Sequence, residues 1–349
     1  MRRLPVFFVL DCSESMVGDN LQAMQQGMQS VMQHLRQDPY ALETVYVSVI
    51  AFAGIVRTLV PLVEVFAYYP VNLPLGGGTS LGKALEHLMN EIDRHVIKTT
   101  EDIKGDWKPI VYLFTDGRPT DRMDDAIYRW NKRYARRVTL VALGIGKAVD
   151  FSTLKRLTEH TIVFEQLESD DFKKFFQWIS ASVMAQSKSI GSGVEQSVLP
   201  PLDERFMQLA KDIKPDTQID EQCVTLVGRC QKLGKPYIIK YDRELQYQAP
   251  EGLGISLYHF RLDNCYPLSE DYFSWSEHMA NQQQVNTTLL QGAPSCPHCF
   301  ADTAFAMCGC GKLMCYDGLT EVVSCPWCQR QVSFGYGGDE GFNVQRGKG

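Results

Sequence analysis

The stretch PVFFVLDCSES, at residues 5–15, joins a run of apolar residues to an abrupt polar segment that begins at Asp11. A short apolar run that ends in a polar turn is typical of a buried strand. Oxygen-bearing side chains then occupy every second position, at Asp11, Ser13 and Ser15. In an open parallel sheet, ligands bind in the crevice beyond the carboxyl ends of the strands. The stretch therefore predicts a core strand with a polar site at its carboxyl end.

Strand-like and helix-like segments alternate through residues 1–186, which we predict to form the first domain. The further strand patterns lie at residues 44–53, 55–66, 109–114, 137–145 and 161–164. The helical patterns lie at residues 18–37, 80–98, 121–134, 150–159 and 169–185. Alternation of this kind favours an α/β fold, a doubly wound and mostly parallel sheet with helices on both faces.

The composition changes after this first domain. Strand patterns follow at residues 223–229, 236–241 and 254–261. The predicted segments are a Ser-, Gly- and Pro-rich linker at 187–201, a small β-rich connector at 202–290, a Cys-rich module at 291–334 and a disordered tail at 335–349. The second half is therefore expected to be β-rich and to end in a zinc-ribbon-like domain.

Composition and charge narrow the class of protein. At about 150 residues per domain, a chain of 349 residues indicates two or three domains. The net charge of −6 argues against a nucleic-acid binder that works through phosphate contacts. The apolar run after Arg3 stops at Asp11 with no small-residue cleavage site, and no segment reaches the roughly 20 apolar residues of a membrane span. We therefore expect no signal peptide, no membrane partner and a cytoplasmic location.

Seven of the eleven cysteines crowd between Cys296 and Cys328. Cys296-Pro-His-Cys299 and Cys325-Pro-Trp-Cys328 form two CxxC knuckles, which predict one tetrahedral structural Zn²⁺ site. A pair of redox sites is the rival interpretation, but neither motif begins a helix in a thioredoxin-like pattern.

Three further cysteines, Cys308, Cys310 and Cys315, lie between the knuckles. They are one ligand short of a second zinc site. The candidates for a fourth ligand are His298, Cys223, Cys230 and Cys265. Alternatively, the inner cysteines pack in a ribbon hairpin without a metal. A third arrangement is a RING-like cross-brace. The missing eighth ligand and the CxC spacing of Cys308 and Cys310 both argue against it.

Two distant residues extend the motif of the opening stretch. Asp11-x-Ser13-x-Ser15 resembles the DxSxS signature of the von Willebrand factor A (VWA) family, whose metal-ion-dependent adhesion site also uses a Thr from a Gly-rich loop and an Asp after a later strand. Thr79 in GGGTS and Asp116 in FTDG occupy those two places. The resemblance implies that Ser13, Ser15 and Thr79 contact a cation and that the two aspartates act through water.

The chemistry of these side chains agrees with that resemblance. Mg²⁺ prefers near-octahedral oxygen coordination, and three hydroxyls with two carboxylates provide oxygen without a fully anionic shell. The ion would keep positive character and bind an Asp or Glu carboxylate of a protein partner. The alternative is that Ser, Thr and Asp here only cap turns and helices. Nearby Asp19 and Asp121 are interpreted as helix-start residues and not as ligands.

The two halves together suggest a narrower family. A VWA-like domain followed by CPxC…CxCGxxxC…CPWC resembles the TerY family of bacterial tellurium-resistance and stress-response systems. That resemblance implies a non-enzymatic adaptor that works with a Ser/Thr kinase and a PP2C-type phosphatase. Two alternatives are a VWA and zinc-finger subunit of a DNA-repair or transcription complex, and a RING-like ubiquitin ligase. The intact five-residue set argues against the former, in which degenerate cation ligands are expected.

Overall fold

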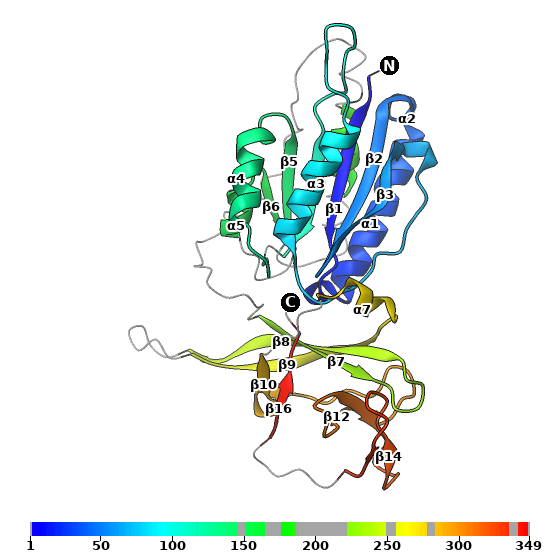
Figure 1. Cartoon of the computed structure of the whole chain (residues 1–349), viewed down its shortest axis with the longest axis vertical. Helices are drawn as coiled ribbons and strands as arrows, with labels where there is room; N and C mark the ends of the chain where they lie inside the picture. Colours follow the sequence, from blue (N-terminus) through cyan, green and yellow to red (C-terminus); the bar gives the residue numbers. More distant parts are fainter. Residues whose placement is uncertain are drawn as a thin grey trace. The chain divides into compact units, whose positions relative to one another are not determined.

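The computed structural model describes residues 2–116, 118–145, 151–164, 176–185, 187, 222–248, 256–277, 283–334 and 341–347. The chain divides into two compact units (Figure 1). The first unit is Met1–Cys12, Gly18–Pro74 and Thr79–Asp216, and the second is Ser13–Val17, Leu75–Gly78 and Thr217–Gly349. The predicted linker lies outside the described residues except at position 187, as does the 202–221 part of the predicted connector.

A six-stranded sheet forms the centre of the first unit, in the order β3-β2-β1-β4-β5-β6. The strands are β1 (Leu4–Asp11), β2 (Val45–Phe52), β3 (Val56–Glu64), β4 (Ile110–Thr115), β5 (Thr139–Ile145) and β6 (Thr161–Phe164). All neighbours pair in parallel except β2 and β3, which pair antiparallel. The predicted doubly wound, mostly parallel sheet is therefore confirmed, and its strand order reverses between β1 and β4.

Helices pack on both faces of this sheet. They are α1 (Asp19–Gln37), α2 (Pro39–Thr44), α3 (Leu81–His95), α4 (Asp124–Arg133), α5 (Phe151–Lys155) and a helical stretch at residues 176–185. Figure 1 shows α3 and α4 over one face. On the opposite face, Phe176 stacks on Phe114 of β4, and its ring lies so close to Gly27 of α1 that an added Cβ there would be 1.9 Å away. The absence of a side chain at Gly27 thus lets α1 and the 176–185 stretch pack together.

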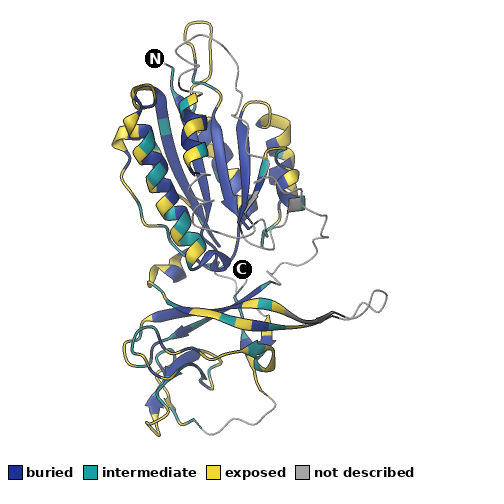
Figure 2. Ribbon diagram, turned by 180° about the vertical axis from the view of Figure 1, so that it is seen from behind, coloured by how far each residue is buried: buried dark blue, intermediate teal, exposed yellow. Residues whose placement is uncertain are grey.

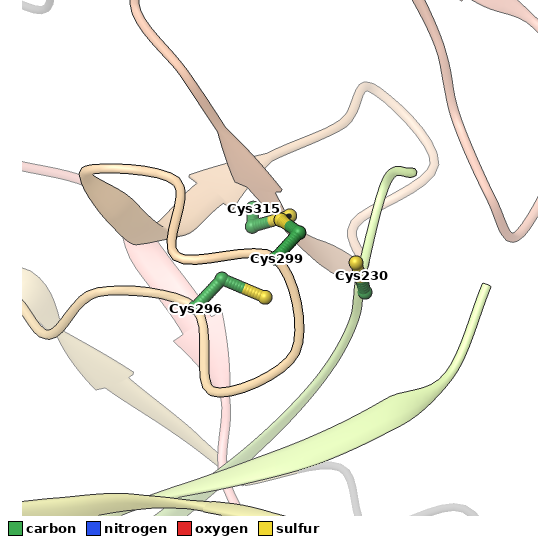
Figure 3. A group of neighbouring side chains, drawn as sticks. All are labelled: Cys230, Cys296, Cys299 and Cys315. Atoms are coloured by element: carbon green, nitrogen blue, oxygen red, sulfur yellow. Dashed lines mark hydrogen bonds between the residues drawn. The ribbon is translucent and has the colours of Figure 1, made fainter. Parts of the chain in front are cut away.

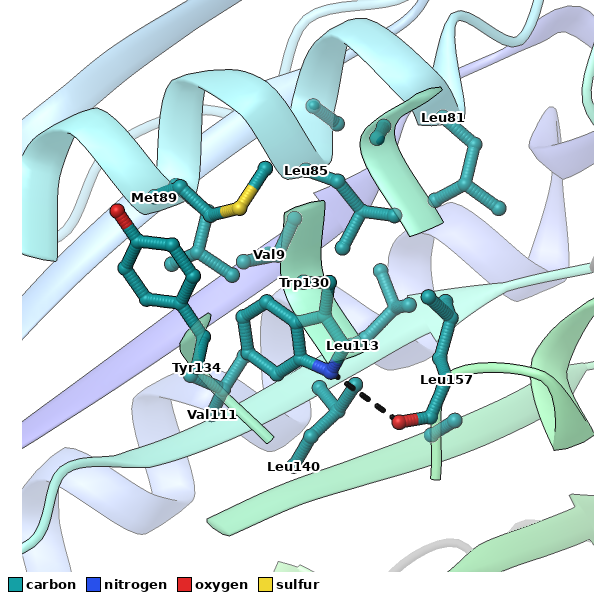
Figure 4. Close-up of a cluster of buried hydrophobic side chains, with 14 of the residues drawn as sticks. Val9, Leu81, Leu85, Met89, Val111, Leu113, Trp130, Tyr134, Leu140 and Leu157 are labelled. Atoms are coloured by element: carbon teal, nitrogen blue, oxygen red, sulfur yellow. Dashed lines mark hydrogen bonds between the residues drawn. The ribbon is translucent and has the colours of Figure 1, made fainter. Parts of the chain in front are cut away.

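The core beneath α3 and α4 is built around Trp130, which is fully buried (Figure 4). Its ring stacks on Tyr134, and its Nε1 donates a 3.1 Å hydrogen bond to the Leu157 carbonyl. Alternate residues of β1, Phe7 and Val9, face this cluster. Because every residue of β1 is buried, the strand is covered on both faces, as its uninterrupted apolar sequence predicts (Figure 2).

The second unit contains another six-stranded sheet, in the order β11-β9-β8-β7-β13-β12. Its strands are β7 (Cys223–Arg229), β8 (Pro236–Gln248), β9 (Ser256–Pro267), β11 (Leu290–Gln291), β12 (Thr303–Met307) and β13 (Leu313–Tyr316). β13 of the Cys-rich segment pairs in parallel with β7 of the predicted connector. The separation of residues 202–290 and 291–334 into two parts is therefore wrong, since both segments contribute to one sheet.

The predicted disordered tail also contains ordered structure. β16 (Asn343–Gln345) pairs antiparallel with β10 (Gln284–Asn286), and Val344 is buried in the same core as Val285. The prediction of disorder for 335–349 is wrong at these residues, because one apolar residue in a glycine-rich segment is enough to complete a strand pair. The second unit also contains α7 (Asp271–Trp275) and the hairpin of β14 (Val323–Ser324) and β15 (Gln331–Val332).

No helix in the described part of the chain combines the length and the apolar character that a membrane span requires.

Candidate metal centres

The ends of β1 and β4 bring two carboxylates to the same edge of the first sheet. Asp11 is the last residue of β1, and Asp116 directly follows the last residue of β4. These strands are parallel neighbours, and the strand order of the sheet reverses between them. Ligand sites in open α/β sheets lie at such a point. Thr115 Oγ1 donates a 2.6 Å hydrogen bond to Asp11 Oδ2, so the end of β4 also orients the Asp11 carboxylate.

Thr79 lies in the turn that precedes α3. Its N–H donates to Thr120 Oγ1 at 2.9 Å, and its carbonyl accepts from the Thr120 N–H at 2.8 Å. Its position is therefore fixed by main-chain contacts to the segment that follows β4. Thr79 itself is 1% exposed.

Ser13 and Ser15 lie in the loop directly after β1. Their Oγ atoms are 3.0 Å apart, so two hydroxyls are within hydrogen-bonding distance of each other. Ser13 also forms an isolated parallel bridge with Gly76, which joins this loop to the Gly-rich turn before Thr79. Ser13 precedes a short 3₁₀ helix, Glu14–Met16, but its side chain does not cap that helix.

All five predicted cation-site residues are buried. The exposed fractions are 0% for Asp11, 0% for Ser13, 8% for Ser15, 1% for Thr79 and 9% for Asp116. Buried carboxylates are costly unless they are hydrogen-bonded or bind a metal. Asp116 Oδ1 accepts a bond from the Arg118 N–H at 3.1 Å, and Asp11 accepts one from Thr115. Hydroxyls and carboxylates in this combination fit a small, hard cation such as Mg²⁺.

The interpretation of Asp121 as a residue at the start of its own helix is wrong. α4 begins at Asp124, whereas Asp121 accepts hydrogen bonds from Gly82 N–H at 3.0 Å and Lys83 N–H at 2.9 Å in the first turn of α3. Burial raises the pKa of Asp121, against the effect of these two bonds, which lower it. The sequence shows no such long-range cap, because the residues involved are 38 and 39 positions apart.

The eight thiols of the second unit that could bind metal form two separate groups. The first group is Cys230, Cys296, Cys299 and Cys315, and the second is Cys308, Cys310, Cys325 and Cys328. Within each group all sulfur atoms lie within 4.8 Å of one another. Figure 3 shows the first group, with the four side chains pointing toward a common centre. Four thiols in such an arrangement fit a closed tetrahedral metal site.

The prediction of one site made of both CxxC knuckles is therefore wrong. Cys296 and Cys299 are in the first group, and Cys325 and Cys328 are in the second. The β12–β13 hairpin lies between the knuckles, so Cys315 on β13 returns to the first group. The two groups thus interleave along the chain, because Cys315 of the first group lies between Cys310 and Cys325 of the second. This interleaving is the feature of the cross-brace arrangement that the sequence left open.

Cys230 supplies the ligand that this cross-brace was missing. It follows β7, and its N–H donates to the Lys235 carbonyl while its carbonyl accepts from Gly234 N–H. Cys296 makes the same pair of bonds, with Ala301 and Phe300. Cys230 therefore occupies a turn like that of a CxxC knuckle but without the second Cys. In the sequence, the signals for Cys230 are the missing eighth ligand, for which it is a candidate, and a Gly four residues after it.

The other proposed ligands of a second site do not join either group. His298 Nε2 donates a 2.7 Å hydrogen bond to the Pro236 carbonyl. Cys265 belongs to the apolar core of the second unit, and burial raises the pKa of its thiol to about 12. Cys223 begins β7, seven residues before Cys230. In the second group, the backbone N–H of Arg330 lowers the pKa of Cys328 to about 7, which favours the thiolate that binds metals.

Comparison with protein families identifies both halves of the chain. Residues 6–178 match the model of the von Willebrand factor type A domain, and residues 220–349 match the model of the TerY-C metal binding domain. The second match covers the whole sheet and both cysteine groups of the second unit, so this unit is a metal binding domain.

Solved structures that are similar to this chain include the following two proteins. A von Willebrand factor type A protein from Catenulispora acidiphila is 18% identical, with a TM-score of 0.42, over 52% of this chain and 43% of that one. Proximal thread matrix protein 1 from the mussel byssus, in a structure with a zinc-occupied MIDAS motif, is 18% identical, with a TM-score of 0.39, over 52% of this chain and 48% of that one. The matches thus span about half of each chain.

The two family matches follow each other along the chain, with residues 179–219 between them. This chain therefore consists of a von Willebrand factor type A domain followed by a TerY-C metal binding domain, an arrangement that matches a TerY-like protein.

Proposed function

We propose that this protein is a non-enzymatic adaptor whose VWA domain binds an acidic residue of a protein partner through a divalent cation. The observation that supports this most strongly is the position of Asp11 and Asp116 at the ends of adjacent parallel strands, both buried, with Thr79 fixed beside the same segment. Ser13 and Ser15 would supply the remaining oxygen ligands.

The composition of this site suits binding better than catalysis. Three of the five side chains are neutral hydroxyls, so a bound Mg²⁺ would retain positive charge toward an incoming ligand. A carboxylate of a partner would be attracted to that ion and would complete its coordination. The partner is therefore expected to present an exposed Asp or Glu.

The two cysteine groups would each bind one structural Zn²⁺. Zinc is the metal that four thiolates in a tetrahedral arrangement favour. Such a site has no open coordination position, so its role would be to stabilise the second unit. Reduced thiolates of this kind persist in the cytoplasm, where the adaptor would act.

The TerY resemblance suggests which proteins the adaptor brings together. The candidates are a Ser/Thr kinase and a PP2C-type phosphatase of the same stress-response system, connected with tellurium resistance. The VWA domain and the zinc-bearing unit would offer two separate binding surfaces, and simultaneous use of both would raise the overall affinity.

The test is direct binding of the full chain to a purified Ser/Thr kinase and a purified PP2C-type phosphatase from the same organism. Binding is measured with Mg²⁺ present and with Mg²⁺ omitted, for the wild type, Asp116→Ala and the matched control Asp102→Ala, which removes an exposed carboxylate from another loop. We expect loss of binding without Mg²⁺ and in Asp116→Ala only. Equal binding under all conditions would contradict the cation-dependent mechanism. Zinc content is measured in parallel, to show that the second unit is intact.

One observation favours a second candidate, a RING-like ubiquitin ligase. Cys315 of the first cysteine group lies between Cys310 and Cys325 of the second, so the groups interleave, and Cys230 supplies the ligand whose absence argued against a cross-brace. An E2-dependent ubiquitin discharge assay with the full chain tests this function. Discharge that is abolished by Cys230→Ser would support it, and no stimulation by any E2 would count against it.

A further inference from the structure

Thr120 and Asp121, beside the predicted cation site, have no assigned role in it. Both lie in the segment that follows Asp116; Thr120 contacts Thr79, just before α3, and Asp121 contacts the first turn of α3. Each contact joins two loops that are about 40 residues apart in the chain. Any role of Thr120 and Asp121 in cation binding rests on the cation site of the proposed function.

The first contact holds the main chain of Thr79. Its N–H donates to Thr120 Oγ1, and its carbonyl accepts from Thr120 N–H, at 2.9 and 2.8 Å. Because the two bonds lie on either side of the Thr79 Cα, they fix the direction in which the Thr79 side chain leaves the backbone. A hydroxyl at position 120 is necessary for the first bond but not for the second.

The second contact satisfies the start of α3. Ser80, the residue before this helix, does not cap it, because its Oγ donates to the Gly54 carbonyl at 2.9 Å. The carboxylate of Asp121 accepts from the N–H groups of Gly82 and Lys83 instead. A carboxylate at this position both satisfies free N–H groups and interacts favourably with the helix dipole. It therefore sets where α3 begins, two residues after Thr79.

The space between these loops leaves no room for them to move closer. A Cβ added at Gly82 would lie 2.5 Å from the Arg122 carbonyl oxygen and 3.1 Å from Asp121 Oδ2. The first turn of α3 and residues 120–122 are therefore in direct backbone contact. This contact and the hydrogen bonds together define a single separation between Thr79 and residues 120–122, which follow Asp116 along the chain.

We infer that Thr120 and Asp121 are positioning residues for the cation site, which fix Thr79 relative to Asp116 and so set the affinity for the ion. Neither side chain is needed as a ligand for this role. Groups that orient metal ligands in this way typically change metal affinity about 10- to 100-fold when they are removed.

The test measures how much Mg²⁺ is needed to stabilise the full-length, zinc-loaded protein against heat. The variants are Thr120→Val, Thr120→Ser and Asp121→Ala, with Asp116→Ala as the reference for a lost site. We expect Thr120→Val and Asp121→Ala to raise the half-saturating Mg²⁺ concentration about ten-fold. Thr120→Ser retains the hydroxyl and should stay close to the wild type.

The outcomes separate this inference from the proposed function. If Mg²⁺ stabilises the wild type and Asp116→Ala equally, the cation site itself is absent and both ideas fail. If Asp116→Ala alone loses the effect while Thr120→Val and Asp121→Ala keep the wild-type Mg²⁺ dependence, the positioning role is wrong and the cation site stands. The inference would also be wrong if Thr120→Val and Asp121→Ala lowered the melting temperature in the absence of Mg²⁺ but left the half-saturating Mg²⁺ concentration unchanged. Both residues would then have a purely structural role.

Discussion

Thr115 Oγ1 donates a 2.6 Å hydrogen bond to Asp11 Oδ2, and both residues are completely buried. The bond joins the last residue of β4 to the last residue of β1. A Thr→Val change keeps the shape of the side chain but removes the donor, so a buried carboxylate loses one of its bonds. We expect Thr115→Val to destabilise the first unit by about 1–3 kcal/mol. Urea unfolding followed by circular dichroism measures the change.

The control for that experiment is Thr115→Ser, which keeps the hydroxyl and should recover most of the stability. If Val and Ser destabilise the unit equally, the loss comes from packing around the methyl group and not from the bond to Asp11.

The alternation of apolar strands and amphipathic helices was sufficient to predict the fold of the first unit. An apolar run predicts a buried strand, and apolar residues at helical spacing predict a helix with one face packed on the sheet. The same pattern placed Asp11 and Asp116 at strand ends. It did not show the contacts of Thr120 and Asp121 with α3, since hydrogen bonds between loops leave no periodic signal. In the second unit, the two CxxC motifs led to the prediction of a single zinc site. The sequence does not show that the β12–β13 hairpin between the motifs separates them and places Cys315 in the first group.

Zinc stoichiometry distinguishes the two cysteine groups from the single site that the knuckles alone would form. If Cys230 is a ligand of the first group, Cys230→Ser should lower the zinc content from about two ions per chain to about one. Cys223→Ser is the matched control, because it changes a buried Cys of the same sheet that lies outside both groups. Metal analysis of the purified full chain gives the ratio. A Cys230→Ser protein that still holds two zinc ions would contradict the assignment.

Removal of zinc is expected to unfold the second unit and to leave the first unit folded. The first cysteine group joins Cys230, after β7, to the CxxC knuckle that begins 66 residues further along the chain, whereas the first unit has its own apolar core. Because a metal bound only in the folded state stabilises that state, a zinc-specific chelator should expose the amides of β7 and β8 to hydrogen exchange. The amides of β1 and β4 should stay protected. Equal loss of protection in both units, or in neither, would be inconsistent with this expectation.

Trp130 is the largest fully buried side chain among the described residues, and it lies in the core that joins α3 and α4 to the sheet. It is fully buried, stacks on Tyr134 and donates a hydrogen bond to the Leu157 carbonyl. Trp130→Ala would leave a large cavity and an unpaired carbonyl, with an expected loss of about 3–5 kcal/mol in the free energy of unfolding of the first unit. Tyr128→Ala, in the same helix but with 66% of the residue exposed, should change it by less than about 0.5 kcal/mol. Chemical unfolding monitored by far-ultraviolet circular dichroism compares the two variants without relying on tryptophan fluorescence. Comparable losses in both would show that helix propensity, and not the buried ring, determines how firmly α4 is held.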